Sequence, residues 1–443
     1  MSAGIDATHD PARRSWIASA NATGTDFPIQ NLPLGIFAPA GGAARGGIAI
    51  GDMILDVGAA LARGWFEGDG AAAAAAMRGA TLNPLMALDR AATRALRRQA
   101  GDLLDAAGAS RRKAEAEAAD LLHPMAACEM RLPVDVRNYT DFYAGIHHAR
   151  AAGALMLPDN PLPANYKHVP IAYHGRASSV CVSGAPVWRP SGQYLGADGA
   201  VVFGPCERLD LELELGFLVR GGNARGEPVA IADADDRLFG VVLLNDWSAR
   251  DIQRWEMAPL GPFLGKNFCT SISAWVVTME ALAPFRCPAM LRPDADPAPL
   301  PYLTDAADQR QGGFDVTLGV AIETERMRSD GAPAQTIIRS NARYLYWTPA
   351  QMIAHHASGG CNLEPGDLIG SGTISGPTRA ELSSMLELTK AGAEPCMLAN
   401  GEQRGFLLDG DEITLTARCV RDGHVPIGLG ACKGRILPLR PHG

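Results

Sequence analysis

The pattern of hydrophobic and polar positions changes near Pro133, and this change divides the chain into two parts. Before it, residues 46–61 read as two short strands around a Gly-Asp turn, and residues 83–121 repeat Ala, Leu, Arg and Glu at helical spacing. After it, short apolar runs alternate with Gly- and Pro-rich turns, which is typical of a large β-rich domain with few helices. We therefore predict domains at 1–133 and 134–443 in an α+β chain that is mostly β.

Two segments of the first part have weaker patterns. Residues 1–15 are small and polar with an early proline, and we expect them to be disordered. Residues 68–80 are dominated by alanine, which favours a helix, but a mobile loop fits this low-complexity composition equally well.

The stretch "LDLELELGF" (residues 209–217) alternates leucine with acid, so a strand would place Asp210, Glu212 and Glu214 on one face. Neighbours on that face lie roughly 6–7 Å apart, and like charges there repel each other. Either the acidic face is solvated while the leucines pack inward, which the alternation alone slightly favours, or a cation binds between the carboxylates.

The segment "NYTDFYAGIHHARAAG" (residues 138–153) holds Asp141 and His148 seven positions apart. If the segment is a helix, these two side chains lie near one face, with Tyr143 and His147 close by. Such a histidine pair at a helix start is more often ordinary surface or core, so the segment gains weight only in combination with others.

A third candidate segment follows the apolar strand "FGVVLLND", which ends at Asp246. Within 25 residues come Arg250, Gln253, Lys266 and Thr270. If a helix starts after the strand, Asp246, Arg250 and Gln253 share a side, and donors then lie beside a carboxylate.

The last candidates lie near the C-terminus. Residues 366–378 form a glycine-rich, hairpin-like turn that carries Thr373. Glu387 lies in a short apolar run, residues 383–389, that we interpret as a strand. If this acid is buried it must be paired, because an isolated buried carboxylate is costly.

Taken together, these segments offer one set of four carboxylates: Asp141, Glu212, Glu214 and Asp246. An all-oxygen set suits Ca²⁺ or Mg²⁺ rather than zinc. Their charge of −4 falls to −2 with one divalent ion, and Lys266 and Arg250 offset most of the remainder. The sequence alone does not show whether these segments lie close together in the folded protein.

Composition narrows the possible functions. The net charge of −8 argues against general nucleic-acid binding. The nine scattered cysteines contain no C-x-x-C pair, so neither a disulfide framework nor a zinc site is predicted. No signal-peptide core and no run of about 18 apolar residues are found, and we expect a cytoplasmic protein. "GPFLGKNF" around Lys266 fails the P-loop spacing.

The order and wording of eight motifs resemble the full-length, two-domain type of the fumarylacetoacetate hydrolase family. These motifs are "YTDFY", "YHGRASS", "LDLELELGF", "NDWSARDIQ", "GPFLGK", "PGDLIGSGTISG", "SMLEL" and "FLLDGDE". The resemblance implies a small N-terminal SH3-like β-barrel, a large C-terminal mixed β-roll or β-sandwich domain, and a homodimer. It also implies hydrolysis of the carbon–carbon bond of a diketo acid, fumarylacetoacetate, to fumarate and acetoacetate, the last step of tyrosine and phenylalanine degradation.

The resemblance also assigns roles to single residues. As holders of Ca²⁺ and/or Mg²⁺ it implies Asp141, Glu212, Glu214 and Asp246, with Lys266 and Thr270 beside the ion. As catalytic groups it implies the general base His148, its orienting acid Glu387, and Arg250, Gln253 and Lys266 around the reacting carbonyl. As substrate contacts it implies Tyr143, Tyr173, Gln253 and Thr373. Asp210 is not among the ligands, so Asp210→Asn is expected to cost much less metal affinity and activity than Glu212→Gln or Glu214→Gln.

Two positions depart from the family pattern. Leu157 and Met257 stand where the family usually carries a substrate-contacting arginine and tyrosine. Either Arg150 or another group compensates, or the substrate is a different acylpyruvate or β-diketo acid that the same metal scaffold hydrolyses or decarboxylates. The four carboxylates alone would also fit a non-enzymatic calcium-binding protein, but such a protein needs neither a general base nor oxyanion donors.

Overall fold

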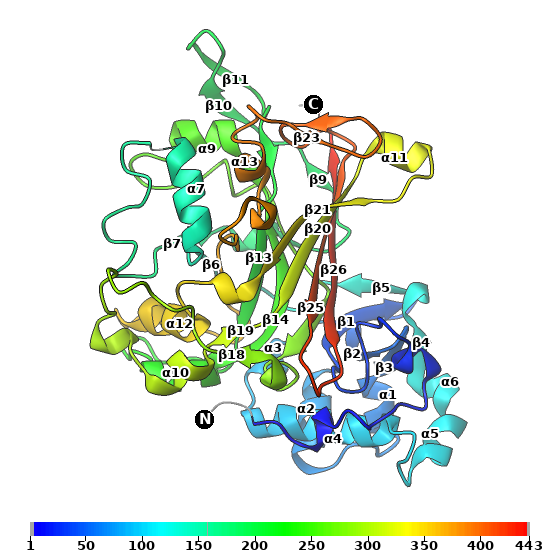
Figure 1. Ribbon diagram of the computed structural model, residues 1–443. Helices are drawn as coiled ribbons and strands as arrows, with labels where there is room; N and C mark the ends of the chain where they lie inside the picture. Colours follow the sequence, from blue (N-terminus) through cyan, green and yellow to red (C-terminus); the bar gives the residue numbers. More distant parts are fainter. Residues whose placement is uncertain (1–3, 157, 441–443) are drawn as a thin grey trace.

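The computed structural model describes residues 4–156 and 158–440, and two large sheets dominate it (Figure 1). The larger sheet has thirteen strands in the described chain: β1 (Leu34–Pro39), β2 (Arg45–Ile50), β3 (Met53–Asp56), β4 (Leu122–Pro124), β5 (Cys128–Arg131), β6 (Tyr139–Phe142), β7 (Ala172–Gly175), β8 (Val180–Val182), β13 (Leu213–Val219), β14 (Leu238–Asp246), β16 (Thr270–Ile272), β17 (Trp275–Thr278) and β22 (Leu368–Gly370). Its main order is β4-β3-β2-β1-β17-β14-β13-β22-β6-β7, with β5, β8 and β16 paired at its sides.

The second sheet has the order β21-β20-β25-β26-β9 and packs against β14 and β17 of the first. Its strands are β9 (Val187–Trp188), β20 (Thr317–Glu323), β21 (Gln335–Asn341), β25 (Glu412–Cys419) and β26 (Ile427–Leu437). Four short two-stranded pairs complete the β structure: β10 (Ser191–Leu195) with β11 (Val201–Pro205), β12 (Leu209–Asp210) with β15 (Ser248–Ala249), β18 (Arg286–Cys287) with β19 (Gly313–Phe314), and β23 (Cys396–Met397) with β24 (Gln403–Arg404).

Helices cluster in the N-terminal part and around the edges of the sheets (Figure 1). The N-terminal ones are α1 (Val57–Ala62), α2 (Gly68–Ala76), α3 (Asn83–Met86), α4 (Arg90–Leu104), α5 (Arg111–Ala116) and α6 (Ala118–Leu121). The others are α7 (Ile146–Met156), α8 (Ile231–Ala234), α9 (Arg250–Glu256), α10 (Ala306–Gln311), α11 (Glu325–Ser329), α12 (Pro349–Ala357) and α13 (Met385–Leu388). None of the helices in the described residues is both long and apolar enough to cross a membrane.

The central strands β13 and β14 separate two hydrophobic cores. Leu215 and Leu243 belong to the core shared with the second sheet, whereas Leu218 and Leu244 belong to the core shared with the N-terminal helices. Side chains alternate between the two faces of a strand. Because both faces of β13 and β14 pack against a core, every residue of these two strands is buried. This double burial determines the environment of Glu214, the acid on β13.

The N-terminal part confirms most of its predicted elements. The expected strand pair is β2 and β3, joined by a tight turn at Gly51 and Asp52, and the alanine-rich segment begins as helix α2. The expected disorder of residues 1–15 is wrong for the described ones, since His9 is buried and Arg13 pairs with Asp105 at 2.7 Å. His9 contacts the backbone oxygen of Glu280 and Arg13 contacts Asp105, and these specific contacts attach the segment to the rest of the fold.

The predicted class, a mixed α+β chain rich in strands, is confirmed. However, the N-terminal strands do not form a sheet separate from that of the C-terminal part. Strand β1 pairs with β2 and β5 and also with β17, so the N-terminal strands continue into the larger sheet. In the described chain no pairing between β4 and β5 closes these strands into the SH3-like barrel that the resemblance implies.

Candidate active site

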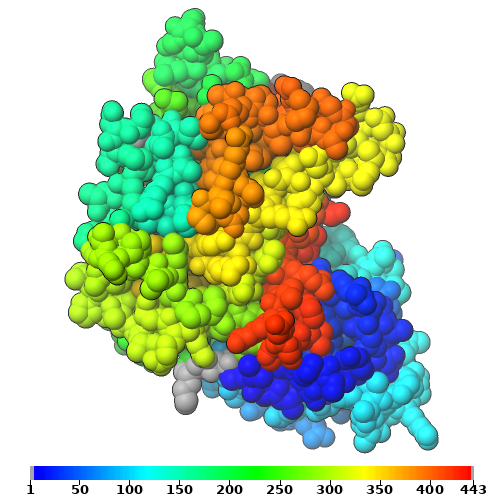
Figure 2. All heavy atoms as spheres, in the orientation of Figure 1, coloured from blue at the N-terminus to red at the C-terminus, as the bar shows by residue number. Residues whose placement is uncertain are grey.

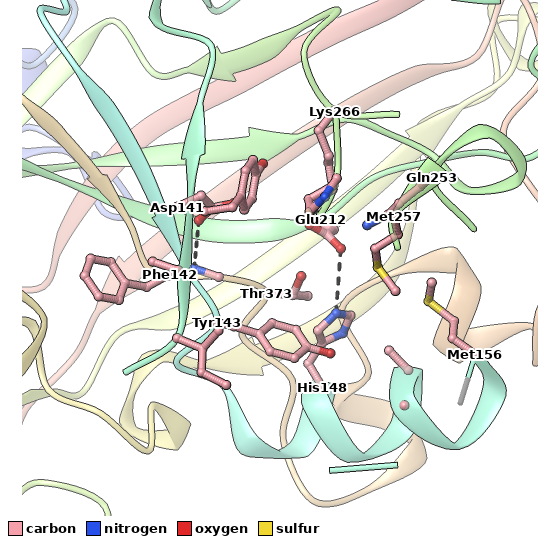
Figure 3. A pocket seen from close by; sticks show the side chains of 18 of the residues that line it. Asp141, Phe142, Tyr143, His148, Met156, Glu212, Gln253, Met257, Lys266 and Thr373 are labelled. Carbon is pink, nitrogen blue, oxygen red and sulfur yellow. Dashed lines mark hydrogen bonds and ion pairs between the residues drawn. The ribbon is translucent and has the colours of Figure 1, made fainter. Parts of the chain in front are cut away.

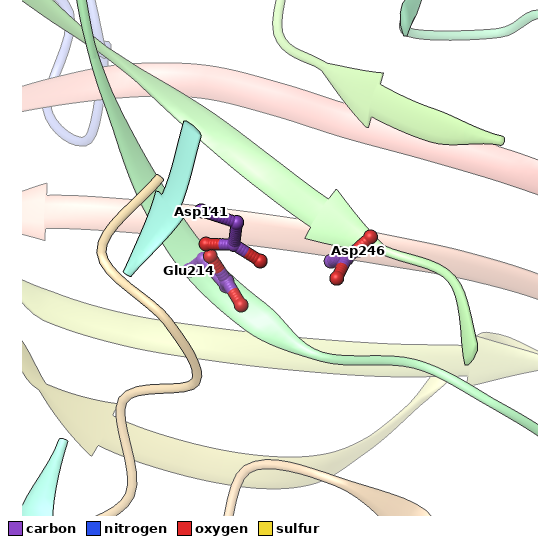
Figure 4. A group of neighbouring side chains, drawn as sticks. All are labelled: Asp141, Glu214 and Asp246. Carbon is purple, nitrogen blue, oxygen red and sulfur yellow. The ribbon is translucent and has the colours of Figure 1, made fainter. Parts of the chain in front are cut away.

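Three carboxylates from three strands meet at one point of the larger sheet (Figure 4). Asp141 lies on β6, Glu214 on β13 and Asp246 at the end of β14, and each offers an oxygen within 4.8 Å of the other two. At most 3% of each residue is exposed. The sheet order β14-β13-β22-β6 brings these distant segments together, as the sequence could only suppose.

Two glycines contribute to the surroundings of these carboxylates. A Cβ atom at Gly370 would lie 2.3 Å from Oδ1 of Asp141. Gly372 has a φ of +73°, and its backbone N–H donates to Asp141 at 3.2 Å and to Glu214 at 3.0 Å. The glycine-rich segment, which the sequence predicted as a turn carrying the substrate contact Thr373, also donates a hydrogen bond to two of the clustered acids.

The negative charge of the acidic cluster is not fully balanced by nearby positive charges or hydrogen-bond donors of the described residues. Burial, together with the neighbouring carboxylates, raises the pKa of Asp141 and of Glu214 well above the usual range. Oε1 of Glu214 is buried and accepts no hydrogen bond from any described residue. An all-oxygen cluster with an unused acceptor fits a Ca²⁺ or Mg²⁺ ion, which would occupy that acceptor and lower the repulsion.

Glu212, two positions before Glu214, has a different environment. Lys266 Nζ contacts its carboxylate and lies 2.6 Å from Asp246, and Arg250 Nη2 lies 2.8 Å from Oε1 of Glu212. Burial alone would raise the pKa of Glu212, but Lys266, Arg250 and His148 together lower it below its usual range. Glu212 is thus neutralised by cations and lies outside the close three-acid cluster, and its role as a metal ligand stays a prediction.

The solvated acidic face proposed for residues 209–217 is wrong. The alternation itself holds, since Leu209, Leu211 and Leu213 all join the hydrophobic core. However, β12 and β13 belong to different sheets, and the acids are buried as well as the leucines. Asp210 is fully buried and bonds to Arg250 instead of facing water.

His148 lies between two acids. Its Nδ1 is 2.8 Å from Oε2 of Glu387. Its Nε2 is 3.6 Å from Oε1 of Glu212, as Figure 3 shows. Oε2 of Glu387 also accepts from Ser375 at 2.9 Å and from Ser384 at 2.8 Å. Although burial opposes it, these partners, His148 above all, hold the pKa of Glu387 below its usual value. The pair therefore resembles a base with an orienting acid.

Three local predictions need correction. Glu387 lies on the one-turn helix α13, not on a strand; Ser384 caps it, and the Ser-x-x-Glu spacing could have indicated a helix start. Asp141 lies on β6 and only His148 lies on α7, so the fold, not helical spacing, brings them together. Asp246 likewise ends a strand before α9 begins, so it shares no helix face with Arg250.

A cavity of about 330 Å³ joins these groups. Eleven of the predicted site residues line it: Asp141, Tyr143, His148, Tyr173, Glu212, Glu214, Arg250, Gln253, Met257, Lys266 and Thr373. Asp246, Thr270 and Glu387 lie behind this lining. Asp246 accepts from Tyr173 at 2.8 Å and from Thr270 at 3.3 Å. Leu157 falls outside the described residues.

The chain is similar to known proteins over nearly its whole length. Residues 30–133 match the family profile described as fumarylacetoacetase N-terminal, and residues 136–437 match that of the fumarylacetoacetate hydrolase C-terminal region. Fumarylacetoacetases from Bos taurus and Homo sapiens are 46% and 45% identical over 421 residues, covering 94% of this chain and 97% of each relative. One from Oryza sativa is 43% identical over 426 residues, covering 95% and 96%.

This chain belongs to the fumarylacetoacetase family. Among solved structures, a fumarylacetoacetate hydrolase from psychrophilic Exiguobacterium antarcticum has a similar fold, with a TM-score of 0.50 at 14% identity. The match covers 92% of this chain and 99% of that one.

For this fumarylacetoacetase-family member, the sequence missed several apolar residues of the cavity lining: Met156, Pro161, Ile171 and Leu260. Met156 lies beside Met257, and these two methionines form what we call the apolar wall of the cavity. Figure 3 shows Met156 and Met257 together, opposite Asp141. These residues come from four separate segments without a shared motif, so only the fold identifies them as neighbours.

Proposed function

We propose that this chain hydrolyses a carbon–carbon bond of fumarylacetoacetate and releases fumarate and acetoacetate, the last step of tyrosine and phenylalanine degradation. The near-full-length similarity to fumarylacetoacetases supports the reaction. The observation that carries the mechanism is the position of His148, which lies between Glu387 and Glu212 and lines the cavity that also contains the acidic cluster.

Asp141, Glu214 and Asp246 would hold Ca²⁺ or Mg²⁺, with Glu212 proposed as a fourth ligand and Lys266 and Thr270 beside the ion. When bound, such an ion supplies a Lewis acid for the paired carbonyl oxygens of a β-diketone. Calcium and magnesium both remain candidates, since oxygen donors suit either.

The protein groups account for the proton and the developing charge. Glu387 holds His148 through Nδ1, which leaves Nε2 to take a proton from water. The water oxygen adds to one carbonyl carbon, and Arg250, Gln253 and Lys266 stabilise the negative charge on its oxygen. The carbon–carbon bond then breaks, its electron pair remains on the leaving carbon, and that carbon takes up a proton.

Substrate contacts are proposed for three further lining residues. Tyr143, Tyr173 and Thr373 all face the cavity. Oγ1 of Thr373 is buried, and no described residue bonds to it, so a substrate oxygen can take that place.

A second candidate function is motivated by the apolar wall. Met257 and Met156 provide neither a charge nor a hydroxyl on the side of the cavity opposite the acids. This wall favours a substrate with one polar group fewer at that end, such as a simpler acylpyruvate or β-diketo acid. The chemistry at His148 would be unchanged.

We also propose that the chain acts as a cytoplasmic homodimer with a domain boundary near Pro133 and an SH3-like N-terminal domain. The support for a dimer is apolar exposure on the β10–β11 hairpin, which projects at the top of the molecule (Figure 2). Phe203 is 69% exposed there. Size measurement in solution tests the oligomeric state.

The decisive assay compares His148→Ala with its neighbour. His147 lies on the same helix but packs edge-to-face against Tyr344 and is not among the residues that line the cavity, so His147→Ala is the matched control. We expect His148→Ala to lower kcat on fumarylacetoacetate by about 10²–10⁴-fold while metal binding persists, and His147→Ala to keep most of its activity. Normal turnover by His148→Ala would contradict the mechanism. Faster wild-type hydrolysis of fumarylpyruvate or simpler diketo acids would favour the second candidate.

A further inference from the structure

Asp210 bonds to two separate parts of the catalytic site without lining the cavity. It lies on β12, is fully buried, and is not among the described residues that line the cavity. Its Oδ1 accepts from the backbone N–H groups of Leu211 at 2.8 Å and Met385 at 2.7 Å. Its Oδ2 accepts from the backbone of Leu386 at 3.0 Å and from Nε of Arg250 at 2.8 Å. Two oxygens thus serve four donors.

One of these connections leads to the proposed oxyanion group. Asp210 holds Nε of Arg250, while Nη1 of the same guanidinium donates to Gln253 at 3.1 Å and Nη2 lies 2.8 Å from Glu212. The guanidinium is therefore held between two carboxylates, and Arg250 is among the residues that line the cavity.

The other connection leads to the proposed base. Met385 and Leu386 are the first two residues of α13, and Glu387 follows directly. Because Asp210 binds the N–H groups of both, it determines where this single turn begins and so where the Glu387 carboxylate meets His148. Ser375 and Ser384 hold the carboxylate itself, but only within a turn that Asp210 anchors to β12.

We propose that Asp210 is a positioning residue for the proposed hydrolysis, which aligns Arg250 and the Glu387–His148 pair at the same time. This role rests on the proposed function. It also revises the expectation that Asp210→Asn has little effect, since that expectation considered only metal ligation.

Asparagine at this position cannot replace the carboxylate. Its single amide oxygen has two lone pairs for four donors, and its NH₂ group would face N–H groups. Arg250 and the first turn of α13 would both shift, and misplacement of about 1 Å in a catalytic group costs up to 10²-fold in rate.

The test is Asp210→Asn, with Asp411→Asn as the matched control. Asp411 is 1% exposed, accepts from Arg404 at 2.8 and 2.9 Å and from the backbone of Leu408 at 2.9 Å, and lies outside the cavity lining. We expect Asp210→Asn to lower kcat on fumarylacetoacetate by about 10–100-fold with KM and Ca²⁺ affinity changed by less than about threefold. Asp411→Asn should lower thermal stability comparably and keep kcat near the wild-type value.

A double-mutant cycle separates positioning from general destabilisation. If Asp210 acts through Glu387, Asp210→Asn lowers kcat less in a Glu387→Gln background than in the wild type. Equal fold-losses in both backgrounds would overturn the proposal, as would a wild-type kcat for Asp210→Asn.

If Asp210→Asn does not fold, Asp210→Glu is the second variant, because it keeps the charge but moves the oxygens by one methylene. A folded Asp210→Glu with unchanged kcat would overturn the proposal. The proposed function fails separately, if wild-type protein with Ca²⁺ does not hydrolyse fumarylacetoacetate.

Discussion

Glu212 and Glu214 are two positions apart and both buried, yet their surroundings are opposite. Glu212 contacts Lys266 and Arg250, whereas Glu214 lies beside Asp141 and receives a backbone N–H from Gly372. The pKa of the first is lowered and that of the second is raised, although burial pushes both upward. Neighbouring charges, not burial, decide which acid is already compensated and which one requires a cation.

This difference divides the cavity by function. Around Glu212, fixed cations and His148 are in place for proton transfer and for a developing oxyanion. Around Glu214, a cluster of acids is suited to a divalent ion.

Glu212→Gln should produce the largest change in stability. The variant leaves Lys266 and Arg250 buried with one negative partner fewer, and breaking a buried ion pair in this way costs about 3–5 kcal/mol. Chemical denaturation of the metal-free protein measures this loss. An unchanged free energy of unfolding would show that Glu212 is not neutralised by these cations.

Glu214→Gln should act on metal binding instead. It removes a charge from the repelling cluster, so the metal-free variant should be at least as stable as the wild type. Ca²⁺ affinity should fall by about 100-fold or more, about 3 kcal/mol, and activity should fall with it. Calorimetric titration and thermal unfolding in chelator check the two effects, and a strongly destabilised metal-free variant would contradict the comparison.

The smallest expected effect is a pH dependence of the metal-free protein. Because the folded-state pKa values of Asp141 and Glu214 are raised, their contribution to stability is present at low pH and is lost as the pH rises through those values. Glu212 and Glu387 have lowered pKa values, so their contribution is lost only as the pH falls through them. Metal-free protein should therefore be most stable at mildly acidic pH.

Metal binding should remove this alkaline loss and release protons from the cluster. Thermal unfolding across pH, with chelator and with Ca²⁺, measures the first effect, and calorimetry in buffers of different ionisation enthalpy measures the second. Glu214→Gln is the matched control and should show a weaker alkaline loss. The same alkaline slope with and without Ca²⁺ would count against the acids as metal ligands.

The sequence predicted the parts of this site better than their arrangement. The motifs pointed to His148, Glu387 and the four acids, because a motif is defined by residue types and their order along the chain, and both can be read directly from the sequence. The roles of Gly372 and Asp210 depend on contacts between segments distant in sequence, and no local pattern encodes them. The alternation around Glu214 correctly placed the leucines in the core, but it could not reveal that the opposite face is buried as well.

The most direct test of the account is the rate of fumarylacetoacetate hydrolysis before and after removal of divalent metal. Chelated and dialysed wild-type protein should remain folded and lose its activity, and added Ca²⁺ or Mg²⁺ should restore it. His148→Ala under the same conditions should bind the added metal and stay inactive. Full-rate hydrolysis by protein shown to be metal-free would contradict the account.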